Sequence, residues 1–379
     1  ANTVDDNTAF GYAALYTNST GDRNTAVGSE SLDHNTTGND NVAVGHDALT
    51  ANTTGTYNVA VGSYSLDANT TAGYNTAVGY GSLSGNTTAI SNTAVGYIAL
   101  FTNSTGAQNT AIGREALYAN TTANSNTAVG YRSLYVNTTG NYNNAVGQQA
   151  LQDNTTGSNN NAFGFQSLYK NTTASNNTAV GHGSLATNTT GAANVAIGAS
   201  ALLLSTTAGS NTAVGYQALY DTTTGTENTA VGRNALVANT TGSYNLALGA
   251  YALDANTTGL YNVAIGNAAL GGNISGQRNT AVGYGAALVN TGTYNTAIGY
   301  TALYDNTSGE NNVAVGPASL GNNTTANDNT AVGFGSLNAN TTGTYNVAVG
   351  ANALDANTTA NNNTALGYNA LSANTTGAN

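Results

Sequence analysis

The sequence contains no cysteine, methionine or tryptophan, and it has a single proline among 379 residues. The absence of cysteine excludes disulfides and thiolate metal sites. Charged residues make up 6% of the chain, far below the usual quarter. The few basic residues are scattered, whereas nucleic-acid binding needs clustered lysine and arginine. No apolar run approaches the ~18 residues of a membrane span. We therefore expect neither a nucleic-acid partner nor a membrane span.

The chain consists almost entirely of one short motif repeated in tandem. An Asn-x-Ala-apolar-Gly segment begins at Asn7 and recurs up to Asn363, which gives 22 repeats. All have 17 residues except the repeat that begins at Asn279, which has 16. Residues 1–6 resemble the tail of a preceding repeat. No linker or composition shift interrupts residues 7–379, so internal periodicity predicts one continuous solenoid over that range.

We number the positions of a repeat from its opening asparagine. Position 3 is always alanine, position 5 is always glycine, and position 4 is always apolar. Position 9 is leucine except in the short repeat, where Leu288 stands one place late. The apolar stretches are too short and too often broken for a helix. They predict an all-β fold, a parallel β-solenoid or β-roll of about 22 coils. We expect two short strands per coil, at positions 2–4 and 8–10.

Alternate residues of a strand point to opposite faces. Because position 4 is always apolar, positions 2 and 4 are predicted to face the core and position 3 to face outward. An outward position that is always alanine suggests a second surface pressed against it, which would be a neighbouring chain. The alternative is a flattened coil that is too thin for anything larger.

A coil of this length cannot bury a core alone, but stacked copies can pair their strands above and below. The asparagines at positions 1 and 12, such as Asn41 and Asn52, are expected to form ladders at the corners of the coil. The glycine at position 5, such as Gly45, is expected to supply a φ that other residues resist.

Position 12 also opens an Asn-x-Ser/Thr sequon in 19 repeats, and such a sequon is a glycosylation acceptor in a secreted protein. Ser205, Thr222 and Asn290 are the exceptions. The alternative is that asparagine and threonine serve the turn alone. The candidate glycosylation sites are Asn18, Asn35, Asn52, Asn69, Asn86, Asn103, Asn120, Asn137, Asn154, Asn171, Asn188, Asn239, Asn256, Asn273, Asn306, Asn323, Asn340, Asn357 and Asn374.

Tyrosine is the conspicuous side chain, with 23 copies against five phenylalanines. All of the tyrosines fall at positions 6, 7 or 10 or at the last residue of a repeat. Two interpretations remain open. The rings could pack over the coil edges and shield the ladder, or they could form a surface that binds glycans by stacking.

The sequence gives no sign of an enzyme. His34, His46 and His182 fall at positions that accept many residue types. The acids that recur at position 10, such as Asp67 and Asp254, are typical of a solvated face rather than a catalytic pair. Calcium-binding β-roll motifs and glycine-rich phosphate loops do not occur. We expect no catalytic residues, cofactor or metal site.

The segment Asn194-Val195-Ala196-Ile197-Gly198 resembles the head repeats of trimeric autotransporter adhesins. The longer phrase over 211–225 is similar to repeat regions of phage tail fibres and bacterial surface fibres. The resemblance implies a left-handed β-roll, packing of three rolls into a trimer, and adhesion at a bacterial surface. The repeats of that family are usually shorter, and its stalk, neck and membrane anchor are not recognisable here.

These observations predict that the protein is an extracellular structural subunit of a fibre or filament, which could also be adhesive. Its expected partner is another copy of the chain, through end-to-end stacking, a lateral homotrimer or both. Both ends of the sequence resemble open coils, as in a segment of a longer fibre. One alternative is an adhesin or tail-fibre binding module that recognises surface glycans. Another is an ice-binding solenoid, because threonine ladders can order water, although Thr-Thr falls at a turn here.

Overall fold

The computed structural model describes residues 6–377, so residues 1–5 of the predicted partial repeat lie outside it. The described chain has 22 strands and contains no helix. It divides into two compact units between Ala192 and Ala193. The strands of the first unit are β1 Thr8–Phe10, β2 Thr25–Val27, β3 Val42–Val44, β4 Val59–Val61, β5 Thr76–Val78, β6 Thr93–Val95, β7 Thr110–Ile112, β8 Thr127–Val129, β9 Asn144–Val146, β10 Asn161–Phe163 and β11 Thr178–Val180. Those of the second are β12 Val195–Ile197, β13 Thr212–Val214, β14 Thr229–Val231, β15 Leu246–Leu248, β16 Val263–Ile265, β17 Thr280–Val282, β18 Thr296–Ile298, β19 Val313–Val315, β20 Thr330–Val332, β21 Val347–Val349 and β22 Thr364–Leu366.

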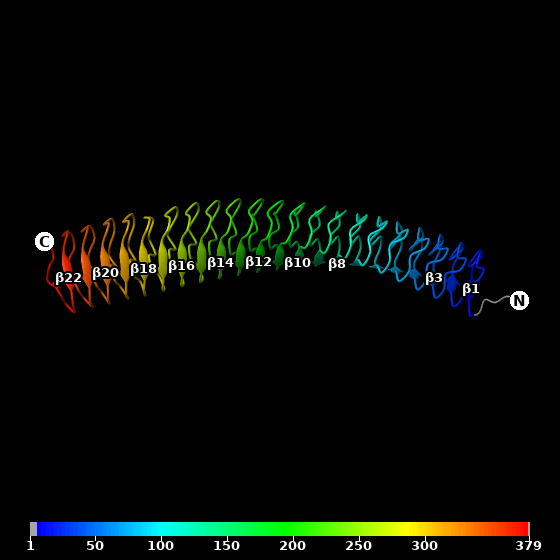
Figure 1. The fold of residues 1–379 in the computed structure, drawn as a ribbon, viewed down its shortest axis with the longest axis horizontal. Helices are drawn as coiled ribbons and strands as arrows, with labels where there is room; N and C mark the ends of the chain where they lie inside the picture. The colour runs from blue at the N-terminus through cyan, green and yellow to red at the C-terminus, as the bar shows by residue number, and fades with distance from the viewer. Residues whose placement is uncertain (1–5, 378–379) are drawn as a thin grey trace. The chain divides into compact units, whose positions relative to one another are not determined.

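Within each unit, successive strands lie side by side and pair in parallel, one strand from each coil (Figure 1). Equivalent residues stand opposite one another, so that Ala26 pairs with Ala43 and Ala43 pairs with Ala60. The register holds at the short repeat, where Thr280 pairs with Thr296. The predicted all-β parallel solenoid with a 17-residue period is therefore confirmed. The continuity of the stack from one unit to the next stays a prediction.

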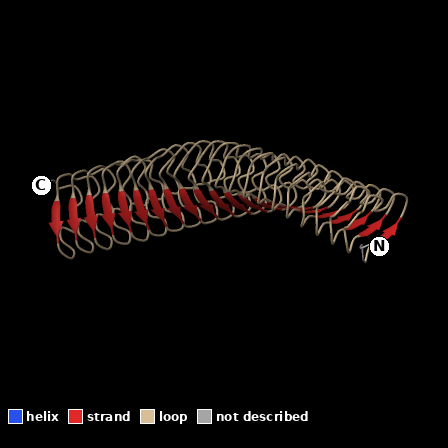
Figure 2. Ribbon diagram, turned by 45° about the vertical axis from the view of Figure 1, so that its right-hand side comes forward, coloured by secondary structure: helices blue, strands red, loops and turns tan. Residues whose placement is uncertain are grey.

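The second strand predicted at positions 8–10 does not form, and the prediction of two strands per coil is wrong. Figure 2 shows one strand in each coil, with loops and turns completing it. The reason lies in the backbone: Asp47 and Leu49, at positions 7 and 9, both have a φ of 55°. Left-handed residues cannot continue a β-strand. The segment still bonds between coils, since Leu49 N donates to Ser65 O at 2.9 Å.

The predicted orientation of the first strand is also wrong. The alanine at position 3 faces the core, as Ala43 and Ala60 show with complete burial. Positions 2 and 4, such as Val42 and Val44, are only half-buried and point outward. The inference of a neighbouring chain from outward alanines therefore loses its basis. The alternative, a flattened coil with little room inside, describes these coils.

One large side chain fills each regular coil that has a neighbour on both sides. The leucine at position 9, such as Leu49 or Leu66, is completely buried although its backbone is left-handed. A left-handed conformation costs a non-glycine residue about 1–2 kcal/mol. Burial of a leucine side chain contributes about 1.5–3 kcal/mol. Burial therefore outweighs the strain, and the inward strand position must be small because leucine occupies the interior.

The two remaining sequence constraints follow from close contacts. Position 8 is alanine or serine because it is buried beside the leucine, and Ser65 Oγ donates to Gly62 O at 2.8 Å within its own turn. Position 5 must be glycine, as predicted. Gly45 has a φ of 137°, and a Cβ there would lie 2.6 Å from the carbonyl carbon of Gly62.

The short repeat, 279–294, keeps the same backbone with a different core residue. Ala287 takes the left-handed inward position with a φ of 51° and is buried, whereas Leu288 is half-buried beside it. The leucine that stands one place late in the sequence therefore does not reach the core site. This coil has a smaller interior side chain than its neighbours.

Candidate functional site

The surface that one coil presents to the next is the most regular feature of the molecule. A regular coil donates backbone N–H groups from positions 2, 9 and 13 to the following coil, as Val42, Leu49 and Thr53 do. It donates from positions 5, 7 and 17 to the preceding coil, as Gly45 and Tyr57 do. Each regular coil thus offers one set of donors to the following coil and a different, complementary set to the preceding coil, and both sets recur from coil to coil.

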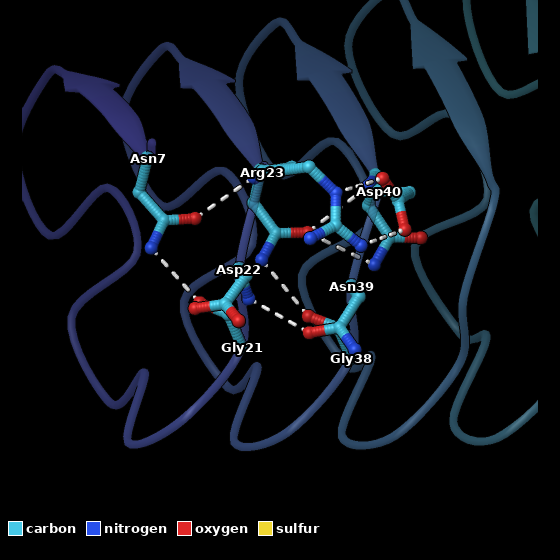
Figure 3. A network of polar contacts seen from close by, with 9 residues as sticks. Asn7, Gly21, Asp22, Arg23, Gly38, Asn39 and Asp40 are labelled. Atoms are coloured by element: carbon cyan, nitrogen blue, oxygen red, sulfur yellow. Dashed lines mark hydrogen bonds and ion pairs between the residues drawn. The ribbon is translucent and has the colours of Figure 1, made fainter. Parts of the chain in front are cut away.

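The asparagine at position 1 joins this interface at one corner of the coil (Figure 3). The Asn7 amide nitrogen donates to Gly21 O at 2.8 Å, which closes its own coil. Its Oδ1 accepts the backbone N–H of Asn24 at 2.8 Å, which holds the following coil. Asn24 repeats the pattern with Gly38. The predicted ladder at position 1 is confirmed.

The asparagine at position 12 forms a second ladder within the core. Asn137 Nδ2 donates to Asn120 Oδ1 at 3.1 Å and to Gly140 O at 3.0 Å, and Asn154 Nδ2 donates to Asn137 Oδ1 at 2.8 Å. All three asparagines are completely buried. The predicted ladder at position 12 is also confirmed, but it runs inside the coil rather than on a surface.

This placement bears on the candidate glycosylation sites. Asn18 and Asn374 are half-buried, and the other 17 candidates are completely buried. The Nδ2 atom that would carry a glycan is, in the regular coils, the atom that donates along the ladder. Glycosylation stays a prediction, and a glycan would have to replace those hydrogen bonds.

The three exceptions at position 12 all lie in the second unit. Thr222 Oγ1 accepts Asn239 Nδ2 at 3.4 Å, a longer contact than the amide bonds of the first unit. Asn290, in the short repeat, donates to Gly292 O at 3.1 Å and accepts from Asn295 at 3.0 Å. Asn273 Oδ1, one coil earlier, is buried without a hydrogen-bond partner.

The outward face of the strands is uncharged and partly apolar. Position 2 is threonine, valine, leucine or asparagine, and position 4 is always an apolar residue. Several position-4 side chains are well exposed for their type, such as Phe163 at 41% and Leu248 at 44%. An apolar residue that recurs at a strand position predicts burial, so the sequence does not point to this exposed face.

Aromatic rings line the edges of the coils in rows. At position 6, Tyr80 and Tyr97 stack with centroids 5.6 Å apart, and at position 17, Tyr57 and Tyr74 stack at 5.1 Å. The rings keep roughly half of their surface exposed. The arrangement covers coil edges, as the first interpretation of the tyrosines expected, and still leaves aromatic surface open to solvent.

Hollows lie between positions 6 and 10 of successive coils in both units. Tyr12, Tyr16 and Asp33 line one hollow of about 480 Å³. Tyr80, Tyr97 and Asp67 contribute to a second of about 430 Å³. A third, in the second unit, measures about 340 Å³ and is lined by residues that include Tyr284, Tyr300, Tyr304 and Asp305. Each combines aromatic rings with at least one carboxylate.

The ion pairs Arg23–Asp40, Arg132–Glu115 and Lys170–Asp153 join neighbouring coils, whereas Arg114–Glu115 lies within one coil. Arg23 and Asp40 form a two-point contact, with both nitrogen–oxygen distances 2.7 Å (Figure 3). Hydrogen bonding to Arg23 lowers the pKa of Asp40. Burial alone would raise the pKa of Glu115, but hydrogen bonds from Arg132 and Arg114 outweigh it and lower that pKa.

Two position-10 carboxylates behave differently. Burial raises the pKa of Asp67, and hydrogen bonding to Ser84 only partly opposes that effect. Burial likewise raises the pKa of Asp254. These groups are half-buried, so the prediction of a fully solvated acidic face at position 10 needs this correction.

The histidines are dispersed. His46 lies 3.0 Å from Asp47 and is half-exposed, His34 is exposed, and His182 stacks on Phe165 at 5.3 Å. Within residues 6–377, no group of three metal-ligating side chains comes together. Over the same residues there is no helix long and apolar enough to cross a membrane.

Neither a scan against protein-family models nor a search of curated proteins found a match to this chain. The resemblance to adhesin head repeats therefore stays a prediction.

Proposed function

We propose that this protein is a structural fibre subunit that works outside the cell and elongates by stacking the coils of one copy on those of another. The supporting observation is the uniform coil-to-coil interface. Because the two sides of a coil are complementary and recur from coil to coil, a second copy finds the pairing that an internal coil would find. An exposed row of strand donors and acceptors is itself a template for pairing.

Electron microscopy of the purified chain tests this proposal. We expect filaments much longer than one molecule, with a coil repeat of about 4.8 Å in fibre diffraction. The variant Thr364→Pro should form shorter filaments or none, because proline removes the N–H that β22 would offer to a following copy. Particles of single-molecule length at every concentration, for both proteins, would contradict end-to-end growth.

We also propose that two copies of the chain associate side by side through the outward faces of their strands. The face carries no charge at positions 2 and 4 in any repeat, and it runs through the successive strands of each unit. A stable interface needs about 800 Å² from each partner, which a face of many strands can supply. Val78→Lys places a charge on this face and should reduce lateral association in sedimentation. A mass that is unchanged and monomeric in both proteins would count against it.

Ice binding is a second candidate function, favoured by one observation. The outward threonines of β5 to β8, at Thr76, Thr93, Thr110 and Thr127, stand in register on neighbouring strands. This array lies on a strand face, unlike the Thr-Thr pair at the turn. Thermal hysteresis measured at high protein concentration tests it, and its absence would remove this candidate.

A further inference from the structure

The groove around Gly81 in the first unit runs along the stacking direction over four coils. Tyr64, Tyr80 and Tyr97, at positions 7 and 6, form one side. The other side is formed at position 10 by a row of four residues, which are Asp67, Ser84, Phe101 and Tyr118. Its volume of about 430 Å³ is within the range of ligand sites in proteins. A groove of this form accepts a linear molecule laid across successive coils.

Gly81 gives the groove its depth. It stands at position 7 with a φ of 60°, and a Cβ there would lie 3.3 Å from Ile98 Cγ2 and 3.4 Å from Phe101 Cε2. Most repeats carry a side chain at this position, as Tyr64 does one coil earlier. Because Gly81 has no side chain, Ile98 and Phe101 of the next coil pack against it and form the floor of the groove, where a Cβ would crowd them.

The same construction occurs independently in the second unit. Gly285 stands at position 7 after Tyr284, and a Cβ there would lie 3.3 Å from Tyr304 Cε2. Glycine occurs at position 7 in four repeats, and in each it follows a ring at position 6; the pairs are Tyr80-Gly81, His182-Gly183, Tyr284-Gly285 and Phe334-Gly335. Two of these pairs, Tyr80-Gly81 and Tyr284-Gly285, lie at or beside a hollow.

The chemistry of the groove selects an amphipathic, uncharged ligand. Tyr80 is 51% exposed and Tyr97 is 50% exposed, so apolar ring surface and phenol hydroxyl groups are both available. Asp67 is half-buried: its Oδ1 is enclosed without a hydrogen-bond partner, and the rest of the side chain is open to the groove. A carboxylate in a chain of net charge −11 repels anions. Sugar rings offer C–H faces for the tyrosines and hydroxyl groups for the carboxylate.

The backbone argues against an extended peptide as the ligand. A peptide strand would need main-chain groups with which to pair. Along the floor of the groove, Gly81 N already donates to Ser63 O at 3.0 Å, and Ile98 N donates to Tyr80 O at 2.9 Å. These two N–H groups are therefore not free to pair with a peptide strand, whereas the side chains of Tyr80, Tyr97 and Asp67 offer polar groups that suit hydroxyl groups.

We propose that the groove around Gly81 binds a neutral, linear polysaccharide along the direction of coil stacking, with sugar rings against Tyr80 and Tyr97 and a hydroxyl group bonded to Asp67. This binding goes beyond the fibre function and does not depend on assembly.

Isothermal titration of the full chain with neutral hexasaccharides tests the proposal. The probes are cellohexaose, chitohexaose, maltohexaose and laminarihexaose, and a hexasaccharide of uronic acids is the charged comparison. We expect at least one neutral probe to bind and the uronic acid probe not to bind. Binding of none of the neutral probes, or of the uronic acid probe alone, would overturn the proposal.

Two variants locate the site. The double variant Tyr80→Ala, Tyr97→Ala should weaken binding about tenfold or more, because it removes two aromatic contacts. Gly81→Gln keeps both rings and places a side chain on the floor of the groove, so it should also abolish most of the binding. Glutamine occurs at position 7 in other repeats, as at Gln149, so the backbone can accept it. The matched control Tyr57→Ala, Tyr74→Ala removes a stacked pair at position 17 and should leave affinity unchanged. Equal affinity in the groove variants and the control would overturn the assignment to this groove, whether or not filaments form.

Discussion

The asparagine ladder at position 12 differs between the two units. In the first unit it is made of asparagine in every repeat, from Asn18 to Asn188, whereas in the second it is broken at Ser205 and Thr222 and altered at Asn290. In a regular coil, Gly157 O accepts amide donors from both Asn143 and Asn154. In the coil of Thr222, the corresponding Gly225 O accepts from Asn211, and Thr222 has no amide to add.

The turn itself barely differs. The backbone N–H of Thr222 donates to Leu219 O at 3.3 Å, the same distance as from Asn137 to Leu134. The backbone therefore sets the shape of the coil, and the asparagine side chain adds stability within it. The comparison predicts which substitutions the ladder tolerates.

The largest effect is expected where an apolar residue enters the regular ladder. Asn137→Leu removes the amide donor that serves Asn120 Oδ1 and Gly140 O, and both of these acceptors are buried. Each unsatisfied buried group costs about 1–3 kcal/mol, so the loss should be about 3 kcal/mol or more. Urea unfolding followed by circular dichroism measures it. If Asn137→Leu lowered the free energy of unfolding by less than Asn137→Thr does, the ladder amide would contribute little to stability.

A smaller effect is expected when the regular ladder is given the residue that the second unit tolerates. Asn137→Thr keeps an oxygen that can accept from Asn154, as Thr222 accepts from Asn239. The expected loss is about 1–2 kcal/mol, since the single hydroxyl hydrogen can serve only one of the two acceptors, Asn120 Oδ1 and Gly140 O, that the amide serves. The same unfolding measurement applies, and Thr139→Asn at the neighbouring exposed turn position is the control.

The converse substitution should stabilise the second unit. Thr222→Asn supplies an amide that can donate to Gly225 O and continue the ladder to Asn239. The expected gain is about 1 kcal/mol, the usual net contribution of a hydrogen bond. Thr224→Asn, at the exposed position of the same turn, should be neutral. A gain of equal size in both variants would point to a turn preference instead of the ladder.

The smallest effect concerns pH. Burial raises the pKa of Asp67 above its unfolded value, so the ionised carboxylate destabilises the folded state at neutral pH. This destabilisation is relieved as the pH falls through the raised, folded pKa toward the unfolded one. Asp67→Asn should therefore stabilise the protein slightly at pH 7 and lose that advantage in acid. Thermal unfolding from pH 7 to pH 3 measures it. If the stability advantage of Asp67→Asn over the original protein grew as the pH fell, the predicted direction of the pH dependence would be wrong.

The sequence predicted the period, the in-register parallel stacking, the two asparagine ladders and the glycine at position 5. These features repeat in almost every coil and depend on contacts between equivalent residues of successive repeats, such as Ala26 with Ala43. The hollow around Gly81 was not predicted, because it combines residues from four coils whose positions 6, 7 and 10 vary. Only the placement of Tyr80, Asp67 and Phe101 on neighbouring coils makes them a groove.

Sequence alone thus determined that successive repeats stack in register. In a stacked fold, a residue that recurs at a fixed interval lies next to the equivalent residue of the neighbouring repeat. Tertiary structure decided which side of the strand is the interior. An apolar residue at position 4 and an alanine at position 3 are both compatible with burial. The interior holds one large side chain, and the left-handed backbone of Leu49 delivers it there. The strand can then contribute only Ala43 inward, and its β-branched residues are left outside because the coil has no volume for them.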